Sequence, residues 1–268
     1  MRESCRHLAH TPPGRRKKFR FKNKLLSLDG SMTGPCASVF DWAADKRTKG
    51  AAKLHLLLDH SGYLPSLAVI TEGKHCELQT ARGLRFETGT IVALDRGYID
   101  YRWFEDLTRQ GVRFVTRMKR DMLHEVLEER SAARSGHLVR DCIIRLGSRK
   151  GRGKGLEMRL RPAGIAAEKG GEPLVFWTND FNPAARTIGE IYRGRWPIES
   201  FFKSPKQSLR IKTFVGASAN ALKTRIWAAL TAMLALNYLQ PRASYGWLLS
   251  NLAALLSPKR FLDRYLYR

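Results

Sequence analysis

The segment Gly89-Thr-Ile-Val-Ala-Leu-Asp95-Arg-Gly97 holds a continuous apolar run, from Ile91 to Leu94, that stops at an aspartate. A short apolar run between a glycine and a turn is typical of a strand that is buried in a sheet. The segment from Phe21 to Leu28 predicts a second strand, which ends at Asp29 and Gly30. Two strands that each lead into an aspartate therefore predict a sheet with carboxylates at its edge.

The segments around these two strands extend the sheet. Residues 53–58 and 66–71 are apolar runs on either side of the turn at Ser61 and Gly62, which predicts a β-hairpin. After this hairpin we expect a helix at 78–84, the strand at 91–94, a helix at 100–110 and a further strand at 112–117.

Residues 120–180 have a different pattern, with short alternating runs at 137–146, 156–160 and 174–178 and a basic loop at 149–154. The segment 184–240 returns to helix and includes the strongly apolar stretch 219–239. This order predicts an α/β core that carries a β-rich insertion. The expected divisions are a basic flexible arm at 1–20, the first part of the core at 21–119, the insertion at 120–180, the helical part of the core at 181–256 and a tail at 257–268.

Charge gives the strongest compositional signal. Lys and Arg number 48 against 24 acidic residues, for a net charge of +24. An excess of this size favours a polyanionic partner such as DNA or RNA, with ribosome-like packing or a membrane-surface patch as the alternatives. Within the arm, Lys17 and Lys18 belong to a basic run that either follows a phosphate backbone or is a solvated tail.

Other features limit the class of protein. The four cysteines are scattered, which argues against a zinc site or a disulfide framework and fits a reducing cytosol. The longest apolar run, 227–236, is too short to span a bilayer, so no membrane partner is expected. The first residues lack the apolar stretch of a signal peptide. These features together predict a chain that works in a reducing cytosol.

The aspartates suit phosphoryl transfer, which commonly uses two divalent cations held by carboxylates from distant parts of a chain. Asp29 and Asp95 each follow an apolar run and have a glycine close behind. Each could equally be an ordinary turn residue, because Asp and Gly are frequent where a strand ends. A metal site would need a third carboxylate near this edge of the sheet.

Glu199 is the candidate for that third carboxylate. Tyr192, Arg195, Glu199 and Lys206 would lie within an arc of about 60° if one α-helix covered them all. An apolar stripe beside this arc could pack on the sheet while the arc faces a site. The alternative is an amphipathic helix whose charge pattern carries no chemistry. Pro197 and Pro205 fall within the stretch, and a proline inside a helix kinks it.

The run Tyr192-Arg-Gly-Arg-Trp-Pro-Ile-Glu199-Ser-Phe-Phe-Lys-Ser-Pro-Lys206 resembles the signature of the insertion-sequence-four-type transposases. These are DDE enzymes with a ribonuclease-H-like core, and a β-rich insertion between the second Asp and the Glu is one of their features. The segment Leu28-Asp29-Gly-Ser-Met-Thr is similar to their first-Asp motif, and Val92-Ala-Leu-Asp95-Arg-Gly-Tyr is similar to their second. The resemblance covers about residues 20–255.

The resemblance implies that Asp29, Asp95 and Glu199 are a catalytic triad that binds two Mg²⁺ or Mn²⁺ ions. It also implies double-stranded DNA as the partner, a homodimer on paired transposon ends, and a location in the bacterial cytoplasm at the nucleoid. Tyr192, Arg195 and Lys206 resemble the residues that hold the transposon end, and Arg195 suits a phosphate because a guanidinium binds it bidentately. Further residues expected at the DNA are Arg96, Lys203 and Trp196, although Trp196 could instead be a core residue.

Three interpretations stay open. The first is an active transposase that cuts and pastes DNA. The second is a truncated remnant that only binds DNA, which the short segments before Asp29 and after residue 256 and the two signature prolines favour. The third is a basic metallonuclease unrelated to transposition. A rival metal set of His55, Asp59 and His75 is weaker, because His55 and Asp59 more simply flank a hairpin.

Overall fold

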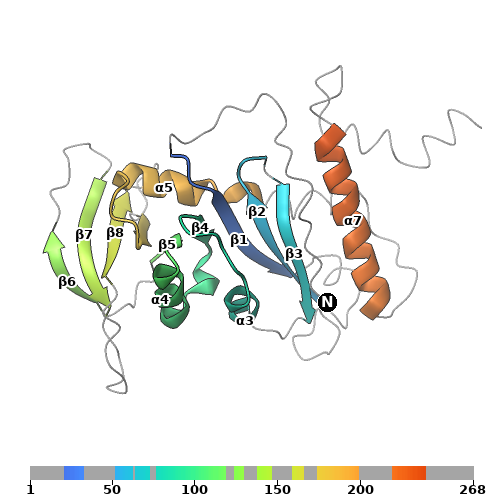
Figure 1. Ribbon diagram of the computed structural model, residues 1–268, viewed down its shortest axis with the longest axis horizontal. Coiled ribbons are helices and arrows are strands. Elements are labelled where there is room, and N and C mark those ends of the chain that lie inside the picture. The colour runs from blue at the N-terminus through green and yellow to red at the C-terminus, as the bar shows by residue number, and fades with distance from the viewer. Residues whose placement is uncertain are drawn as a thin grey trace, which may run out of the picture.

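The protein is described by a computed structural model that covers residues 21–32, 52–62, 64–72, 77–118, 124–129, 138–146, 159–165, 174–198 and 219–239. Its centre is a nine-stranded sheet with the order β3-β2-β1-β4-β5-β9-β8-β7-β6 (Figure 1). The first five strands in the chain are β1 (Leu25–Met32), β2 (Ala52–Asp59), β3 (Leu64–Glu72), β4 (Ile91–Leu94) and β5 (Arg113–Arg117). The last four are β6 (His124–Glu129), β7 (Leu138–Leu146), β8 (Arg159–Ile165) and β9 (Leu174–Thr178).

Strand direction changes across the sheet. β1, β2 and β3 form an antiparallel meander, whereas β4 and β5 run parallel to β1. β9 returns antiparallel to β5, and β8, β7 and β6 continue from it as antiparallel neighbours. The parallel centre therefore brings the carboxyl ends of β1 and β4 to the same edge.

Helices cover both faces of the sheet because the side chains of each buried strand alternate between them. In β4, Val92 and Leu94 pack on one face, whereas Ile91 and Ala93 pack on the other. The first face is covered by the segment with α3 (Glu77–Arg82), the 3₁₀ helix η1 (Arg96–Tyr98) and α4 (Tyr101–Arg109). The second is covered by α5 (Ala185–Arg193), and α7 (Ala219–Leu239) lies beside β3 (Figure 1).

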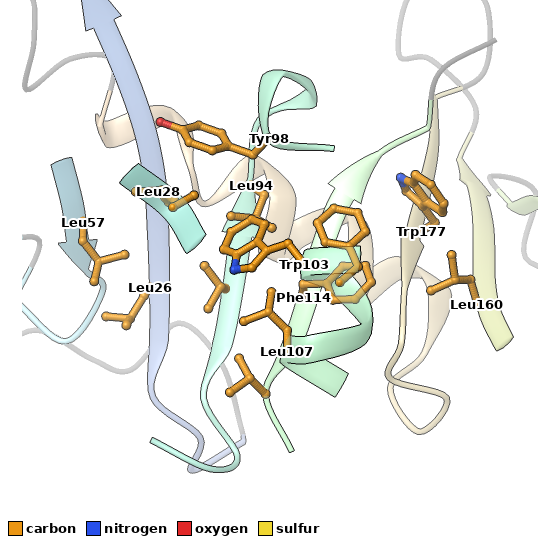
Figure 2. Close-up of a cluster of buried hydrophobic side chains, with 14 of the residues drawn as sticks. Leu26, Leu28, Leu57, Leu94, Tyr98, Trp103, Leu107, Phe114, Leu160 and Trp177 are labelled. Atoms are coloured by element: carbon orange, nitrogen blue, oxygen red, sulfur yellow. The ribbon is translucent and has the colours of Figure 1, made fainter. Parts of the chain in front are cut away.

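Aromatic and leucine side chains fill the α4 face of the sheet (Figure 2). The rings of Phe104 and Phe114 stack with centroids 4.2 Å apart, and Trp177 meets Phe104 edge-on at 6.0 Å. Leu28 and Leu94 continue this layer toward the edge that carries the aspartates. The core on the α4 face therefore extends to the residues just before Asp29 and Asp95.

The predicted hairpin at 53–71 is confirmed as β2 and β3, and three predicted elements have the bounds expected: β4, β9 and α7. Two expectations were wrong in detail. Strand β1 continues through Asp29 to Met32, because its residues up to Met32 pair with β2. β6 was not predicted, since all six positions of its sequence His-Glu-Val-Leu-Glu-Glu are half-exposed or exposed and the sequence lacks a clear alternation.

Strands β6–β9 confirm that residues 120–180 are rich in β-structure where the structure describes them. They extend the central sheet, because β9 pairs directly with β5. The division of the chain into five parts, with this segment as an insertion, stays a prediction. None of the helices in the described part of the chain is both long and apolar enough to cross a membrane.

Candidate active site

Asp29 and Asp95 lie side by side at the parallel centre of the sheet. The β1–β4 register pairs Leu28 with Leu94, so the two aspartates are the next residues on neighbouring strands. Neighbouring strands are about 4.8 Å apart, which brings the two side chains within reach of one group. Asp29 shares the α5 face with Leu25, because residues two apart in a strand point the same way. The predicted pairing of these two aspartates is thus seen in the described structure.

Arg195 joins the two carboxylates. Its Nη1 donates to Asp29 Oδ2 at 2.8 Å, and its Nη2 lies 3.7 Å from Asp95 Oδ1. The Arg195 and Asp29 side chains are only 7% and 15% exposed, whereas that of Asp95 is 43% exposed. The site is therefore closed on the Arg195 side and open to solvent at Asp95.

Tyr192 supports Arg195 from α5. The Arg195 guanidinium carbon lies 5.5 Å from the centroid of the Tyr192 ring, within the range of a cation–π interaction. The Tyr192 ring is buried and packs on Phe176 of β9, with centroids 4.8 Å apart. The sheet, the tyrosine and the arginine therefore form a stack that ends at the two aspartates.

A turn, rather than a continuous helix, aims Arg195 at the site. Helix α5 ends at Arg193, Gly194 and Arg195 form a turn, and helix resumes at Trp196. A Cβ at Gly194 would lie 3.1 Å from Ile191 O and 3.2 Å from His60 Cε1, so a larger residue would crowd this turn. Pro197 then falls in the first turn of the next helix, where its missing N–H is not needed.

The single-helix arc predicted from Tyr192 to Lys206 is accordingly wrong in its first part, because Tyr192 and Arg195 precede the break. Arg195 still reaches the aspartates, but through the turn. Glu199 and Lys206 lie outside the described residues, as do Lys203, Lys17 and Lys18.

Trp196 and Arg96 flank the site at the surface. The Trp196 side chain is 62% exposed, so the alternative of a buried core tryptophan is wrong. Arg96, which directly follows Asp95, is also exposed. Both residues are in a position to meet a partner, and their contact with DNA stays a prediction.

The opposite face of the sheet brings a third carboxylate and a tyrosine beneath the site. Glu77, at the start of α3, pairs with Lys53 of β2 at 3.0 Å. Its Oε2 lies 2.8 Å from the point that a Cβ on Gly97 would occupy, and Asp95 Oδ2 lies 3.9 Å from the same point. Tyr98 reaches under β1, where its hydroxyl lies 3.4 Å from His55 Nδ1.

The pKa values of two buried tyrosines, Tyr98 and Tyr192, are shifted by burial and by these charges. Burial raises the pKa of Tyr98 far above its ordinary value, with further increases from the carboxylates of Glu77, Asp29 and Asp95 and a smaller opposing effect of Arg195. Burial also raises the pKa of Tyr192, which the Arg195 guanidinium lowers in part. Both hydroxyls are therefore protonated and uncharged at neutral pH.

Glu77 and Tyr98 were not among the residues that the sequence indicated. They are separated from Gly30 by more than 40 positions, so no local spacing links them to the first aspartate. The available signal was the pair of glycines, Gly30 and Gly97, which had been interpreted as turn residues. At each of these glycines, a polar side-chain atom of another residue lies within 3 Å of the position that a Cβ would occupy: Tyr98 Oη at Gly30 and Glu77 Oε2 at Gly97.

The donor set suits a hard divalent cation. Asp29 and Asp95 contribute carboxylate oxygens that already face one positively charged group, and such oxygens are the ligands that Mg²⁺ and Mn²⁺ prefer. In the described part of the chain, no three His, Cys, Asp or Glu side chains are grouped to hold a metal ion. Glu199, the predicted third ligand, is outside that part.

The rival metal set of His55, Asp59 and His75 is not supported by the described geometry. His55 is buried and bonds to Thr71 and Tyr98. Asp59 lies four residues further along β2, about 13 Å away along an extended strand, and accepts from the Ser61 N–H. His75 is outside the described residues.

Comparison with known proteins gives a consistent answer. The sequence matches the transposase DDE domain family over residues 20–235. It is 31% identical over 212 residues to the transposase-like protein y4zB of Sinorhizobium fredii, a match that covers 78% of this chain. It is also 26% identical over 226 residues, or 84% of the chain, to a protein assigned as the transposase of insertion sequence element IS5377 in Geobacillus stearothermophilus. The matches span 59% of the length of each of these relatives.

The fold is also similar to that of a solved transposase. The cryo-EM structure of the piggyBac transposase synaptic complex with hairpin DNA superposes with a TM-score of 0.51 at 10% identity. The match covers 91% of this chain and 54% of the piggyBac chain. At this identity the similarity concerns the fold, which is the ribonuclease-H-like fold of DDE transposases. The family match itself argues against the third interpretation, a metallonuclease unrelated to transposition.

Proposed function

The chain belongs to the transposase DDE domain family, and on that premise we propose that Asp29, Asp95 and Glu199 cut DNA and transfer its strands in a metal-dependent reaction. The observation that carries the proposal is the meeting of Asp29 and Asp95 on neighbouring parallel strands, where Arg195 contacts both. Carboxylates 66 residues apart are brought together there by the sheet itself.

Asp29 and Asp95 would hold Mg²⁺ or Mn²⁺, with Glu199 as the third ligand. Two such ions would supply activation of water or of a 3′-hydroxyl and stabilisation of the charge at the attacked phosphorus. The exposure of Asp95 leaves its carboxylate accessible from solvent, as a ligand that must meet a DNA phosphate requires. Asp29, which is less exposed than Asp95, would fix the position of the site relative to the sheet.

Arg195 would bind the phosphate next to the cut. Its guanidinium can hold a phosphate bidentately, and it already lies between the two aspartates. Tyr192 would act through Arg195, because its buried ring holds the guanidinium in place. Trp196 would stack on an unpaired base, and Arg96 would contact the backbone beside it.

DNA is the proposed partner. The net charge of +24 suits a phosphate backbone, and the basic residues Lys17, Lys18, Lys203 and Lys206 would add to its binding. We infer a cut-and-paste reaction of an insertion sequence, membership of the insertion-sequence-four-type subfamily, and a homodimer on paired ends at the bacterial nucleoid. The β-rich segment between Asp95 and Glu199 would be the insertion of that subfamily.

The test is nicking of a supercoiled plasmid with Mg²⁺, Mn²⁺ or EDTA. We compare the wild-type chain with Asp95→Asn, which keeps the size of the side chain but removes its charge. We expect nicking that needs the metal and is lost in this variant. Asp59→Asn is the matched control, since Asp59 ends a neighbouring strand and belongs to the rival metal set, and it should nick like the wild type.

Each result separates the remaining interpretations. DNA binding without nicking under any metal would favour the remnant that only binds DNA. Nicking that survives Asp95→Asn but is lost in Asp59→Asn would move the site to β2. Equal unfolding midpoints for the three proteins establish that the comparison concerns chemistry rather than folding.

A further inference from the structure

Tyr98 lies beneath the two aspartates on the face of the sheet opposite α5. It is the last residue of η1, three positions after Asp95, and its ring is 1% exposed within the α4-side core. Figure 2 shows its hydroxyl pointing away from the other labelled side chains, toward β1. The residue therefore connects the segment that carries Asp95 with the strand that carries Asp29.

The contact depends on the absence of a side chain at residue 30. A Cβ on Gly30 would lie 2.8 Å from the Tyr98 hydroxyl oxygen and 3.1 Å from His55 Nδ1, closer than ordinary packing allows. Gly30 lies inside β1, pairs with His55 of β2 and directly follows Asp29. A glycine is needed at this position so that the Tyr98 hydroxyl can come close to the β1 backbone. Backbone conformation does not explain it, because Gly30 has no positive φ.

A polar chain continues from Tyr98 across the sheet. His55 Nδ1 is 3.4 Å from the Tyr98 hydroxyl, and its Nε2 is 3.0 Å from Thr71 Oγ1 on β3. These contacts link η1 to three neighbouring strands at the level of the aspartates. Arg195 contacts the same aspartates from the α5 face, so the site is held from both sides of the sheet.

We propose that Tyr98 is a positioning residue, whose hydroxyl against Gly30 and His55 fixes the spacing of the Asp29 and Asp95 carboxylates for the metal. The inference rests on the proposed function, because it assigns a role toward the metal that Asp29 and Asp95 would hold. Residues that orient metal ligands from behind commonly change metal affinity when they are replaced. A tyrosine that only fills the core would change stability instead.

The experiment is a titration of the full chain with Mn²⁺, in which electron paramagnetic resonance counts the free ion. We expect Tyr98→Phe to weaken Mn²⁺ binding roughly tenfold. Tyr101→Phe is the matched control: it removes a half-buried tyrosine hydroxyl on α4 and should bind Mn²⁺ like the wild type. Unfolding midpoints measured on the same samples separate a change in the site from a loss of fold.

Gly30→Ala gives the second, independent variant. The added methyl group collides with the Tyr98 hydroxyl and should also weaken binding. Combining Gly30→Ala with Tyr98→Phe removes the closer of the two collisions and leaves only the tight contact with His55 Nδ1 at 3.1 Å. The double variant should therefore bind Mn²⁺ more tightly than Gly30→Ala alone. This rescue would not arise if the two positions acted separately.

The outcomes are distinct. Wild-type affinity in Tyr98→Phe, or a double variant weaker than Gly30→Ala, would overturn the positioning role and leave the proposed function intact. A wild-type chain that binds no Mn²⁺, or binds it as well after Asp95→Asn, would overturn the proposed function and the positioning role with it.

Discussion

Two buried arginines in this molecule contact carboxylates in different ways. Arg161 of β8 binds both oxygens of one aspartate, Asp141 of β7, with Nε to Oδ1 at 2.8 Å and Nη2 to Oδ2 at 2.6 Å. Both side chains are less than 10% exposed. Arg195 instead divides its two terminal nitrogens between aspartates of two strands, one of which is 43% exposed.

The two arginine sites differ in whether a carboxylate remains accessible to a ligand. Arg161 also donates to the backbone carbonyls of Phe181 and Pro183, so it fastens β7 and β8 to the segment before α5. That pair is enclosed and offers nothing to a ligand. Asp95 still faces solvent, which is what a metal ligand needs. Both arginines are buried, so in this molecule the exposure of the carboxylate partner, rather than the burial of the arginine, distinguishes the two sites.

Removing Arg161 should give the largest change in stability. In Arg161→Leu, Asp141 is left as a buried charge with no cation, and loss of one partner of a buried pair costs about 3–5 kcal/mol. Urea unfolding measures the loss. Arg109→Leu is the control, because Arg109 also contacts two carboxylates but is exposed, and such pairs contribute about 0–1 kcal/mol.

The double variant Arg161→Leu with Asp141→Leu sharpens this prediction. It leaves no lone charge in the interior and should recover much of the stability. A loss below about 1 kcal/mol in Arg161→Leu would mean that the enclosed pair is no stronger than a surface pair, and the contrast between the two arginines would fail.

Replacing Arg195 should affect function more than stability. If Arg195 holds the phosphate, Arg195→Ala should slow plasmid nicking roughly a hundredfold, the effect of losing one donor that stabilises developing charge. The unfolding free energy should fall by less than in Arg161→Leu, because Asp29 and Asp95, the carboxylates left without Arg195, are both more exposed than Asp141. Arg195→Lys keeps the charge without the bidentate geometry and should recover only part of the nicking rate.

The opposite pattern would show that the two arginines are alike. If Arg195→Ala destabilised the chain as strongly as Arg161→Leu while the folded fraction nicked DNA at the wild-type rate, Arg195 would be structural. Nicking and urea unfolding on the same preparations decide between the two.

Elements with a sharp change in polarity could be predicted from the sequence. β4, β9 and α7 have the expected bounds because each is an apolar run with polar residues or a turn at its ends. The sequence also indicated that Asp29 and Asp95 each follow an apolar, strand-like run, although either could have been an ordinary turn residue. The family resemblance added the expectation that they act together, and the family match confirms that resemblance at the level of DDE transposases.

Contacts between distant residues could not be predicted in this way. Pro197 is a local sign of the break after Arg193, but the approach of His60 to Gly194, from 134 positions earlier in the chain, could not be read from the sequence. The Tyr98–Gly30 contact likewise forms only when η1 folds back beneath β1. The Arg161–Asp141 pair depends on the β7–β8 register, which an alternating pattern leaves undetermined. Hydrophobic periodicity reports which face is buried but not which polar atoms meet there.

The smallest predicted effect is on the unfolding free energy at alkaline pH. It tests whether burial and the nearby carboxylates raise the pKa of Tyr98. Burial and three carboxylates raise the pKa of Tyr98 in the folded chain above the unfolded value near 10. The folded state then binds more protons above pH 10, so this contribution to stability is complete below pH 10 and is lost as the pH rises further. The loss is at most about 1.4 kcal/mol per pH unit.

Tyr98→Phe should therefore have a flatter decline of unfolding free energy between pH 9 and about pH 11 than the wild type, in urea unfolding with EDTA present. Tyr101 provides the comparison, because burial raises its pKa without a contribution from any carboxylate. Tyr101→Phe should flatten the decline less, since Tyr101 is also less buried. Equal slopes for Tyr98→Phe and the wild type would mean that neither burial nor the carboxylates of Asp29, Asp95 and Glu77 raise the pKa of Tyr98, so that water reaches its hydroxyl. Solvent would then reach further into the sheet beside the Arg195 site than the low exposure of Asp29 indicates.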